Sequence, residues 1–215
     1  MKVVIEMKVL VIGAHGQVGQ QLVRDLSAQG EEVYAGIRNM AQAQDFAQDV
    51  HTVALDVTGS VAAMTKTMLG MDAVIFAAGS GSKTGDDMTL RVDLDGAIKS
   101  MTAAAAAQVN KYILVSALYA DQREKWPAAI LPYYVAKYYS EEWLKRESGL
   151  NYLIIQPSTL LNEPARGTIA VNDGTAGAVT RADVAHAVAV ALRKAPRWRA
   201  SYEIVAGSTP IDAAF

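Results

Sequence analysis

The chain has 215 residues, of which 51% are hydrophobic and 20% charged, and 20 Lys and Arg nearly balance 22 Asp and Glu at a net charge of −2. This is the composition of an ordinary globular protein, so disordered, collagen-like and disulfide-scaffold classes fit poorly. Without an excess of cations, nucleic acid is not an expected partner. Because the chain has no cysteine and its three histidines are far apart in the sequence, thiol catalysis is excluded and no metal site is expected.

The length favours one domain, residues 1–215, because domains average about 150 residues and no linker divides the chain. No apolar run reaches the roughly 18 residues that a membrane span needs, so a cytoplasmic protein that does not contact a membrane is expected. Met7-Lys8-Val9-Leu10 is similar to a second start, which suggests that residues 1–6 are an alternative N-terminal extension.

Seven short runs rich in Val, Ile and Leu are predicted to be strands. They alternate with stretches of helical periodicity, which is typical of a parallel sheet covered on both faces. The predicted strands are Lys8–Ile12, Glu32–Gly36, Thr52–Leu55, Ala73–Phe76, Tyr112–Val115, Tyr152–Gln156 and Tyr202–Val205. The sequence therefore predicts an α/β fold, a Rossmann-like doubly wound parallel sheet of about seven strands with helices on both faces.

Six helices are predicted between the strands, near residues 16–29, 41–49, 60–69, 87–108, 132–148 and 181–194. Asn39 is expected to cap the second, and Thr180 with Asp183 matches a capping box before the last. The less regular segments are 79–86, 117–132 and 158–177. Loops that leave the carboxyl ends of strands bind ligands in open α/β sheets, so these three are predicted to wall the pocket.

A glycine-rich loop, residues 13–19, joins the first predicted strand to the first helix. Its first glycine permits a tight turn, the second lets the backbone approach a pyrophosphate, and the third lets the helix pack closely on the strand. The spacing Gly-x-x-Gly-x-x-Gly, in this strand-to-helix context, predicts a dinucleotide site; the alternative is a packing turn that binds nothing. The predicted cofactor contacts are Gly13, His15 (through its backbone), Gly16, Gln17, Val18 and Gly19.

Arg38 follows the second predicted strand, where a site for NAD usually has a carboxylate that binds the ribose 2′-hydroxyl. A guanidinium there can instead donate a fork of hydrogen bonds to a 2′-phosphate, and no carboxylate is adjacent in the sequence. NADP is therefore favoured over NAD. The alternative is that Arg38 is a solvated charge that only stacks on the adenine.

Further motifs follow the later strands. They are Asp56-Val57, Ala77-Ala78-Gly79, Ser116, Tyr133-x-x-x-Lys137, Gln156-Pro157-Ser158 and Thr180-Arg181-x-Asp183. With the glycine loop, they make the chain resemble the short-chain dehydrogenase/reductase superfamily, and more closely its compact branch of epimerase-like and flavin-reductase-like NAD(P)-binding proteins. The resemblance implies that Asp56 and Val57 contact the adenine, that Ala77, Ala78 and Gly79 line the ribose, and that Pro157 and Ser158 border the nicotinamide.

The same resemblance implies a catalytic set of Ser116, Tyr133 and Lys137. Tyrosine would protonate a carbonyl oxygen as hydride arrives, lysine would lower the tyrosine pKa and bind the ribose, and serine would hydrogen-bond the same oxygen. The spacing puts Tyr133 and Lys137 on one helix face. The alternative is an aromatic packing stripe with a solvated lysine. Many relatives carry a relay asparagine before the fifth strand; this chain has residues 92–96, Val-Asp-Leu-Asp-Gly, so that relay is expected to be missing or altered.

The expected function is NADP-dependent reduction of a small carbonyl, quinone or flavin-like substrate, or a related epimerase or dehydratase reaction. The extended members of the family that bind nucleotide sugars have a much longer region after the position of Ser158. Fewer than 60 residues follow Ser158 here, so a large nucleotide-sugar pocket is not expected. The alternative function, from another class, is an NADP-binding redox sensor that acts through a partner protein. A monomer or a homodimer is expected.

Overall fold

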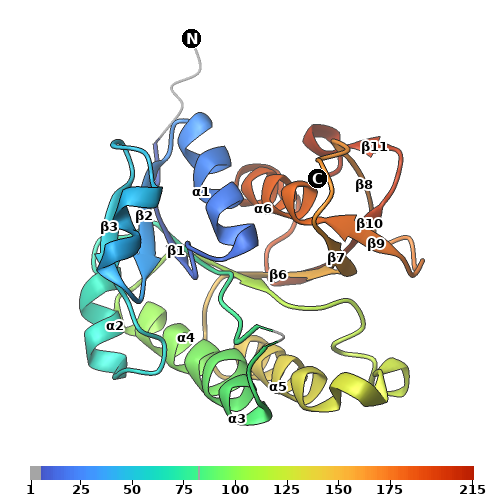
Figure 1. Ribbon diagram of the computed structural model, residues 1–215, viewed down its shortest axis with the longest axis horizontal. Coiled ribbons are helices and arrows are strands. Elements are labelled where there is room, and N and C mark those ends of the chain that lie inside the picture. The colour runs from blue at the N-terminus through green and yellow to red at the C-terminus, as the bar shows by residue number, and fades with distance from the viewer. Residues whose placement is uncertain (1–5, 82) are drawn as a thin grey trace.

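A nine-stranded sheet crosses the molecule in the order β11-β8-β10-β6-β5-β4-β1-β2-β3 (Figure 1). The computed structural model describes residues 6–81 and 83–215; of the expected extension 1–6, only Glu6 falls within them. Seven neighbouring strands are parallel and confirm the seven predicted ones. They are β1 (Lys8–Ile12), β2 (Glu32–Ile37), β3 (His51–Ala54), β4 (Ala73–Phe76), β5 (Lys111–Val115), β6 (Tyr152–Pro157) and β10 (Ala200–Ala206).

The predicted count of seven strands was wrong, because the sheet continues beyond β10. The strands β8 (Thr168–Val171) and β11 (Thr209–Pro210) extend it in antiparallel pairing, and β7 (Thr159–Leu161) with β9 (Ala178–Thr180) forms a separate two-stranded sheet. These four strands are short and lie among polar residues, glycine and proline. Such segments carry too little apolar alternation to be predicted from the sequence.

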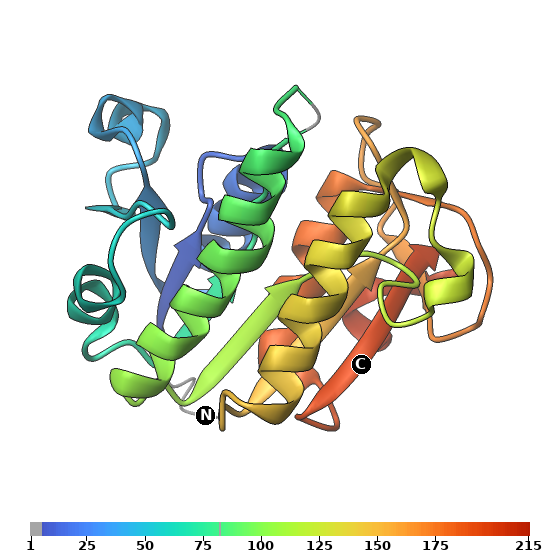
Figure 2. The same ribbon diagram turned by 90° about the horizontal axis from the view of Figure 1, so that it is seen from below.

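Helices cover both faces of the sheet, as predicted (Figures 1 and 2). One face carries α1 (Gln17–Ala28) and α6 (Arg181–Lys194); the other carries α2 (Val61–Met68), α4 (Ala97–Ala106) and α5 (Leu131–Arg146). Strand residues alternate between two cores: Val9 and Val11 pack under α1 and α6, whereas Leu10 and Ile12 pack under α2 and α4.

The fourth predicted helix contains an irregularity. It runs from α3 (Asp86–Met88) through a π-helical segment, η2 (Thr89–Gly96), into α4. A π-helical turn carries its side chains out of the ordinary α-helical register and is frequent at functional sites. Its buried acidic residue, Asp93, belongs to the site described below.

The second predicted helix, 41–49, is shorter than expected. It is a 3₁₀ helix, η1 (Met40–Asp45), that buries none of its residues, so no apolar face stabilises a longer helix. Asn39 caps it by accepting a hydrogen bond from the Ala41 amide at 3.0 Å, as predicted. The capping box of α6 is also confirmed: the Thr180 hydroxyl accepts from the Asp183 amide at 3.0 Å.

The remaining elements are short. Three further 3₁₀ helices are η3 (Arg123–Lys125), η4 (Ala128–Ile130) and η5 (Ile211–Ala213). Across the described ranges, 6–81 and 83–215, no helix has the length and apolar character of a membrane span.

The chain reverses its direction across the sheet between β1 and β4. From β1 it proceeds outward to β2 and β3, returns to β4 beside β1, and then continues to β5, β6 and β10. In an open parallel sheet, this switch point leaves a crevice at the carboxyl ends of the strands, where ligands bind.

Candidate cofactor and active site

Two adjoining cavities lie at this crevice. One, of about 400 Å³, lies over the ends of β1, β2 and β3 and is called the β2 cavity below. The other, of about 440 Å³, lies between β4, β5 and α5 and is called the α5 cavity. They share one wall, formed by Ala78, Gly79, Ser80 and Thr84. An elongated ligand could therefore occupy both.

The glycine loop has the geometry that the sequence predicted. Gly13 has a φ of +82°, and a Cβ there would lie 2.6 Å from the Ala78 Cα, so only glycine fits. A Cβ at Gly19 would lie 2.2 Å from the Gly13 carbonyl oxygen, which explains how α1 packs so closely on β1. Gly16 is the N-cap of α1 and offers no side chain to its first amides. This uncapped helix N-terminus fits an anionic group such as a pyrophosphate.

His15 contributes its side chain, as well as its backbone, to the structure of the glycine loop. Its Nε2 lies 2.9 Å from an Asp45 carboxylate oxygen, and its ring packs edge-on against Phe46. The glycine loop is thus tied to η1 and to Phe46 beside the β2 cavity, which His15 lines and Asp45 does not. Val18 lines the α5 cavity, whereas Gln17 is exposed at the first residue of α1 and lines neither cavity.

Arg38 and Asp56 line the β2 cavity together with Val57. Hydrogen bonds from the Thr58 amide and hydroxyl, at 2.9 and 2.8 Å, lower the pKa of Asp56, and the Arg38 charge lowers it further. No carboxylate is adjacent to Arg38 in the sequence, as noted above, but the fold brings the Asp56 carboxylate close enough for the Arg38 charge to act on it. Asn39 and Gln42 line the same cavity; the sequence reasoning missed both as cavity residues.

Ser116, Tyr133 and Lys137 all line the α5 cavity, together with Ala77. Ser116 follows β5, and the other two side chains lie one turn apart on α5. The Lys137 ammonium lies 5.4 Å from the centre of the Tyr133 ring. The Ser116 hydroxyl is buried and has no hydrogen-bond partner among the described residues. The structure thus brings the three predicted catalytic residues together around one cavity.

Asp93 adds a buried negative charge that the sequence reasoning did not assign. Its Oδ1 lies 3.2 Å from the Lys137 ammonium, and the two side chains are only 1% and 3% exposed. Its Oδ2 accepts a hydrogen bond from the Ser80 amide at 3.0 Å. Asp93 lies in the segment where a relay was expected to be missing or altered, and it joins Lys137 to the wall that both cavities share.

Burial and neighbouring charges shift the pKa of Tyr133. Burial raises the pKa of Tyr133 above its usual value, and the Lys137 charge only partly opposes that shift. Burial opposes the charge of Lys137, but the tyrosinate form of Tyr133 and the Asp93 carboxylate outweigh it and raise the pKa of that ammonium. The Tyr133 pKa is therefore raised, whereas the resemblance implied a lowered tyrosine pKa.

Glu141 is a second buried carboxyl group, one turn beyond Lys137 on α5. It is fully buried, and it accepts hydrogen bonds at 3.1 Å from the Gln156 amide nitrogen and at 3.2 Å from Lys145. Burial raises the pKa of Glu141, against the lowering effects of Lys145, Ser116 and Gln156. The Ser116 hydroxyl is close enough to affect that carboxyl group but lacks hydrogen-bond geometry to it.

Not every predicted residue reaches the cavities. Pro157 is buried at the end of β6, and neither it nor Ser158 lines the α5 cavity, although Leu160 does. The Ser158 hydroxyl is buried without a hydrogen-bond partner. Among the predicted wall segments, 79–86 lines both cavities, 117–132 contributes Ala129, Ile130 and Pro132, and 158–177 contributes only Leu160.

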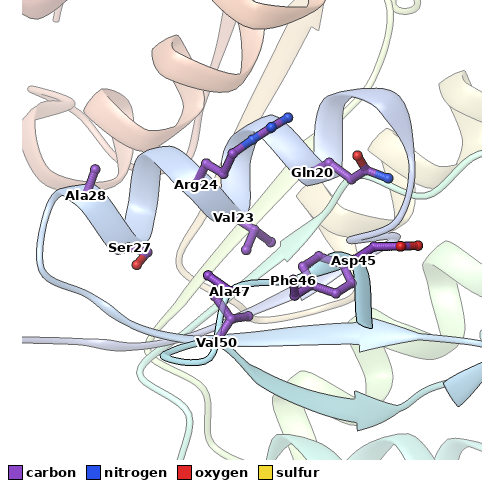
Figure 3. A pocket seen from close by; sticks show the side chains of 9 residues that line it. All are labelled: Gln20, Val23, Arg24, Ser27, Ala28, Asp45, Phe46, Ala47 and Val50. Atoms are coloured by element: carbon purple, nitrogen blue, oxygen red, sulfur yellow. The ribbon is translucent and has the colours of Figure 1, made fainter. Parts of the chain in front are cut away.

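A third cavity, of about 320 Å³, lies away from these residues, between α1 and the segment that joins η1 to β3. Figure 3 shows Val23 of α1 facing Phe46, Ala47 and Val50 across it. It contains none of the predicted site residues. Only Val23 and Val50 of its lining are buried, and no predicted catalytic or cofactor-binding residue lines it, so it is not a candidate for the reaction.

Comparison with known proteins gives the family. The chain matches the NAD(P)H-binding family over residues 13–195. It is 42% identical over 208 residues to YhfK of Bacillus subtilis, an uncharacterized sugar epimerase by name, covering 95% of this chain and 97% of that protein. The crystal structure of the oxidoreductase YlbE from Lactococcus lactis superposes with a TM-score of 0.91 at 36% identity, covering 97% of this chain and 94% of that one.

A second solved structure, a proposed NAD-dependent epimerase/dehydratase from Bacillus halodurans, has a TM-score of 0.89 at 33% identity and covers 96% of this chain and 97% of that one. Both solved structures share the arrangement of an α/β oxidoreductase-like domain with this chain. The family match spans the glycine loop, both cavities and the helices that line them. The protein belongs to the NAD(P)H-binding family.

Proposed function

We propose that the protein is an NADPH-dependent reductase of the short-chain dehydrogenase/reductase type that acts on a small carbonyl or quinone. The observation that carries the proposal is the position of Ser116, Tyr133 and Lys137 around one cavity, which adjoins the glycine loop cavity through a shared wall. The names of the relatives, an oxidoreductase and an epimerase, are compatible with nicotinamide chemistry at such a site.

The dinucleotide would extend across both cavities. The uncapped N-terminus of α1 would bind its pyrophosphate, and Asp56 and Val57 would contact the adenine. Arg38 would bind the 2′-phosphate of NADP through its guanidinium, which is the basis for preferring NADP over NAD. Lys137 would bind the ribose on the other side of the shared wall.

NADPH, when bound, would supply the hydride for the carbonyl carbon of the substrate. Tyr133 donates its phenolic proton to the carbonyl oxygen, so that the product is an alcohol and the tyrosinate then regains a proton from water. Ser116, whose hydroxyl has no partner among the described residues, donates a hydrogen bond to the same oxygen. The raised pKa of Tyr133 makes its phenol a weaker acid than a free tyrosine, so proton donation depends on the position of the hydroxyl beside the carbonyl oxygen.

The test is a panel of small aldehydes, quinones and flavins assayed by NADPH oxidation, beside calorimetric titration of NADPH and NADH. Turnover of at least one carbonyl or quinone, with NADPH bound more tightly than NADH, is the expected result. Reduction of flavin alone would indicate hydride transfer to an acceptor that needs no proton from Tyr133. Absence of nicotinamide binding would overturn the proposal altogether.

A second candidate is an NADP-binding redox sensor, and the Asp93–Lys137 ion pair favours it. Asp93 compensates the charge of Lys137, which would otherwise lower the pKa of Tyr133 further and make the phenol a stronger acid. Tight NADPH binding without turnover of any substrate would support the sensor. A pull-down that compares NADP-loaded and empty protein would then identify the partner.

A further inference from the structure

The α5 cavity has a predominantly apolar lining. Eight of its residues present aliphatic side chains: Val18, Ala77, Ala78, Val115, Ala129, Ile130, Pro132 and Leu160. The wall that carries Ile130 is fixed from behind, because the Trp126 ring nitrogen donates at 3.1 Å to the Tyr119 carbonyl and the Tyr134 hydroxyl donates at 3.1 Å to the Leu118 carbonyl. An apolar wall held in this way favours an apolar ligand.

Positive charge in this cavity is compensated. Lys137 is the one cation among the described residues that line it, and Asp93 lies 3.2 Å from its ammonium. Lys83 belongs to the 79–86 loop, but it is exposed and does not line the cavity. A substrate phosphate or carboxylate would find no free cation inside.

The mouth of the cavity carries negative charge. Asp86 lines it, and Asp87 follows in the first turn of α3. Backbone amides at a helix start ordinarily attract anions, but here two carboxylates already lie beside them. An anionic substrate would therefore meet repulsion at the entrance as well as desolvation inside.

We propose that the α5 cavity selects neutral, mainly apolar carbonyl compounds and rejects those with a phosphate or carboxylate close to the carbonyl. This inference rests on the proposed function and narrows its substrate. Moving an ion from water into an apolar cavity is costly unless an opposite charge compensates it. The cation in this lining, Lys137, is already paired with Asp93. Nucleoside diphosphate sugars, which carry two negative charges, are excluded for the same reason.

A matched substrate pair tests the selectivity. Methyl 4-formylbenzoate and 4-formylbenzoate share the same ring and aldehyde, but only the second is an anion. The ester withdraws more electron density from the aldehyde, so the ratio of their borohydride reduction rates in water is divided out of the enzymatic ratio. We expect kcat/KM for NADPH-dependent reduction to be about 50-fold higher for the ester, because the carboxylate must lose water without a partner. Equal values, or a preference for the carboxylate, would overturn the proposal.

Two charge variants locate the effect. Asp86→Lys places a cation at the mouth, and we expect the ester-to-carboxylate ratio to fall about fivefold, a modest change because the position is exposed and screened. Glu147→Lys makes the same change in net charge at an exposed residue that lines neither the cavity nor its mouth. The control should leave the ester rate and the ratio within about twofold of the parent. An equal fall of the ratio in both variants would indicate a general charge effect and contradict the proposal.

Binding separates this proposal from the proposed function. If neither aldehyde is reduced, saturation-transfer NMR on the NADPH-loaded protein, whose nicotinamide ring is neutral, compares binding of the same two compounds. Preferential binding of the ester would support the charge selection while the reductase function fails. Binding of the carboxylate at least as strongly, binding of neither compound, or binding of UDP-glucose to the NADPH-loaded protein would overturn the selection.

Discussion

The two cavities are built from different parts of the chain. The β2 cavity is formed by backbone that must be glycine and by exposed polar side chains, Arg38 and Asp56 among them. The α5 cavity depends on charges that are almost entirely buried, Asp93, Lys137 and, beyond it, Glu141. The exposed polar side chains of the β2 cavity can be substituted one at a time without affecting the core. Each buried charge of the α5 cavity, in contrast, is compensated by another charge. Substitutions on the two sides should therefore fail in different ways.

The largest expected effect is on the rate of reduction. Tyr133→Phe removes the proton donor but keeps the ring in place, so reduction of a carbonyl or quinone should fall by about 10²–10⁴ while NADPH affinity stays the same. Steady-state kinetics beside calorimetric titration measures both. An unchanged rate would show that tyrosine is not the acid.

The next largest effect is on the free energy of unfolding. Two aspartates of the segment 92–96 allow a comparison of a buried and an exposed ion pair. Asp93→Leu leaves the Lys137 ammonium buried without its partner and should lower the free energy of unfolding by about 3–5 kcal/mol. Asp95→Leu breaks only the exposed pair with Lys99 and should lower it by less than about 0.5 kcal/mol. Urea denaturation of the two variants compares them. Equal losses would mean that the buried pair stabilises the fold no more than the exposed pair does.

Two glycines of the loop separate binding from folding. At Gly16 a Cβ would lie 3.2 Å from the Gly13 carbonyl, a tight contact that small shifts relieve, so Gly16→Val should abolish NADPH binding through a clash with the pyrophosphate and leave most of the fold intact. At Gly19 the corresponding distance is 2.2 Å, so Gly19→Ala should destabilise the fold itself by about 1–3 kcal/mol.

Circular dichroism melts and fluorescence titration of both variants separate the two effects. Normal NADPH binding by Gly16→Val would show that the loop is only a turn. A Gly19→Ala variant as stable as the parent would show that α1 can move away from β1 at no cost.

The smallest effect concerns the choice of cofactor. Arg38→Ala should weaken NADPH binding by about 1–3 kcal/mol, the usual contribution of a charged hydrogen bond, and leave NADH binding nearly unchanged. Calorimetric titration with both cofactors measures the difference. Asp56 lies near enough for Arg38 to lower its pKa, so an equal loss for both cofactors would assign Arg38 to the adenine side instead.

The parallel strands and the glycine loop could be predicted because local rules specify them. Buried parallel strands such as β1 and β4 require continuous apolar runs, and both strands have the predicted bounds. Gly13 and Gly19 are required by contacts with residues near them in the fold, Ala78 and Ala14. The caps at Asn39 and Thr180 are interactions over two or three residues, which the sequence displays directly.

By itself, then, the sequence determined the parallel core, the helices on its two faces and part of the set of residues around the cavities. Tertiary structure alone decided which charges compensate one another. Asp93 and Lys137 are far apart along the chain, and a carboxylate on a helix is ordinarily solvated, so nothing in the local pattern of Asp93 or Glu141 indicates burial. Strand β8 likewise forms because β10 offers it a partner, and the edge strand β11 because β8 does. The protonation of Tyr133 follows from burial and from those distant charges, because long-range electrostatics depends on the folded arrangement rather than on sequence neighbours.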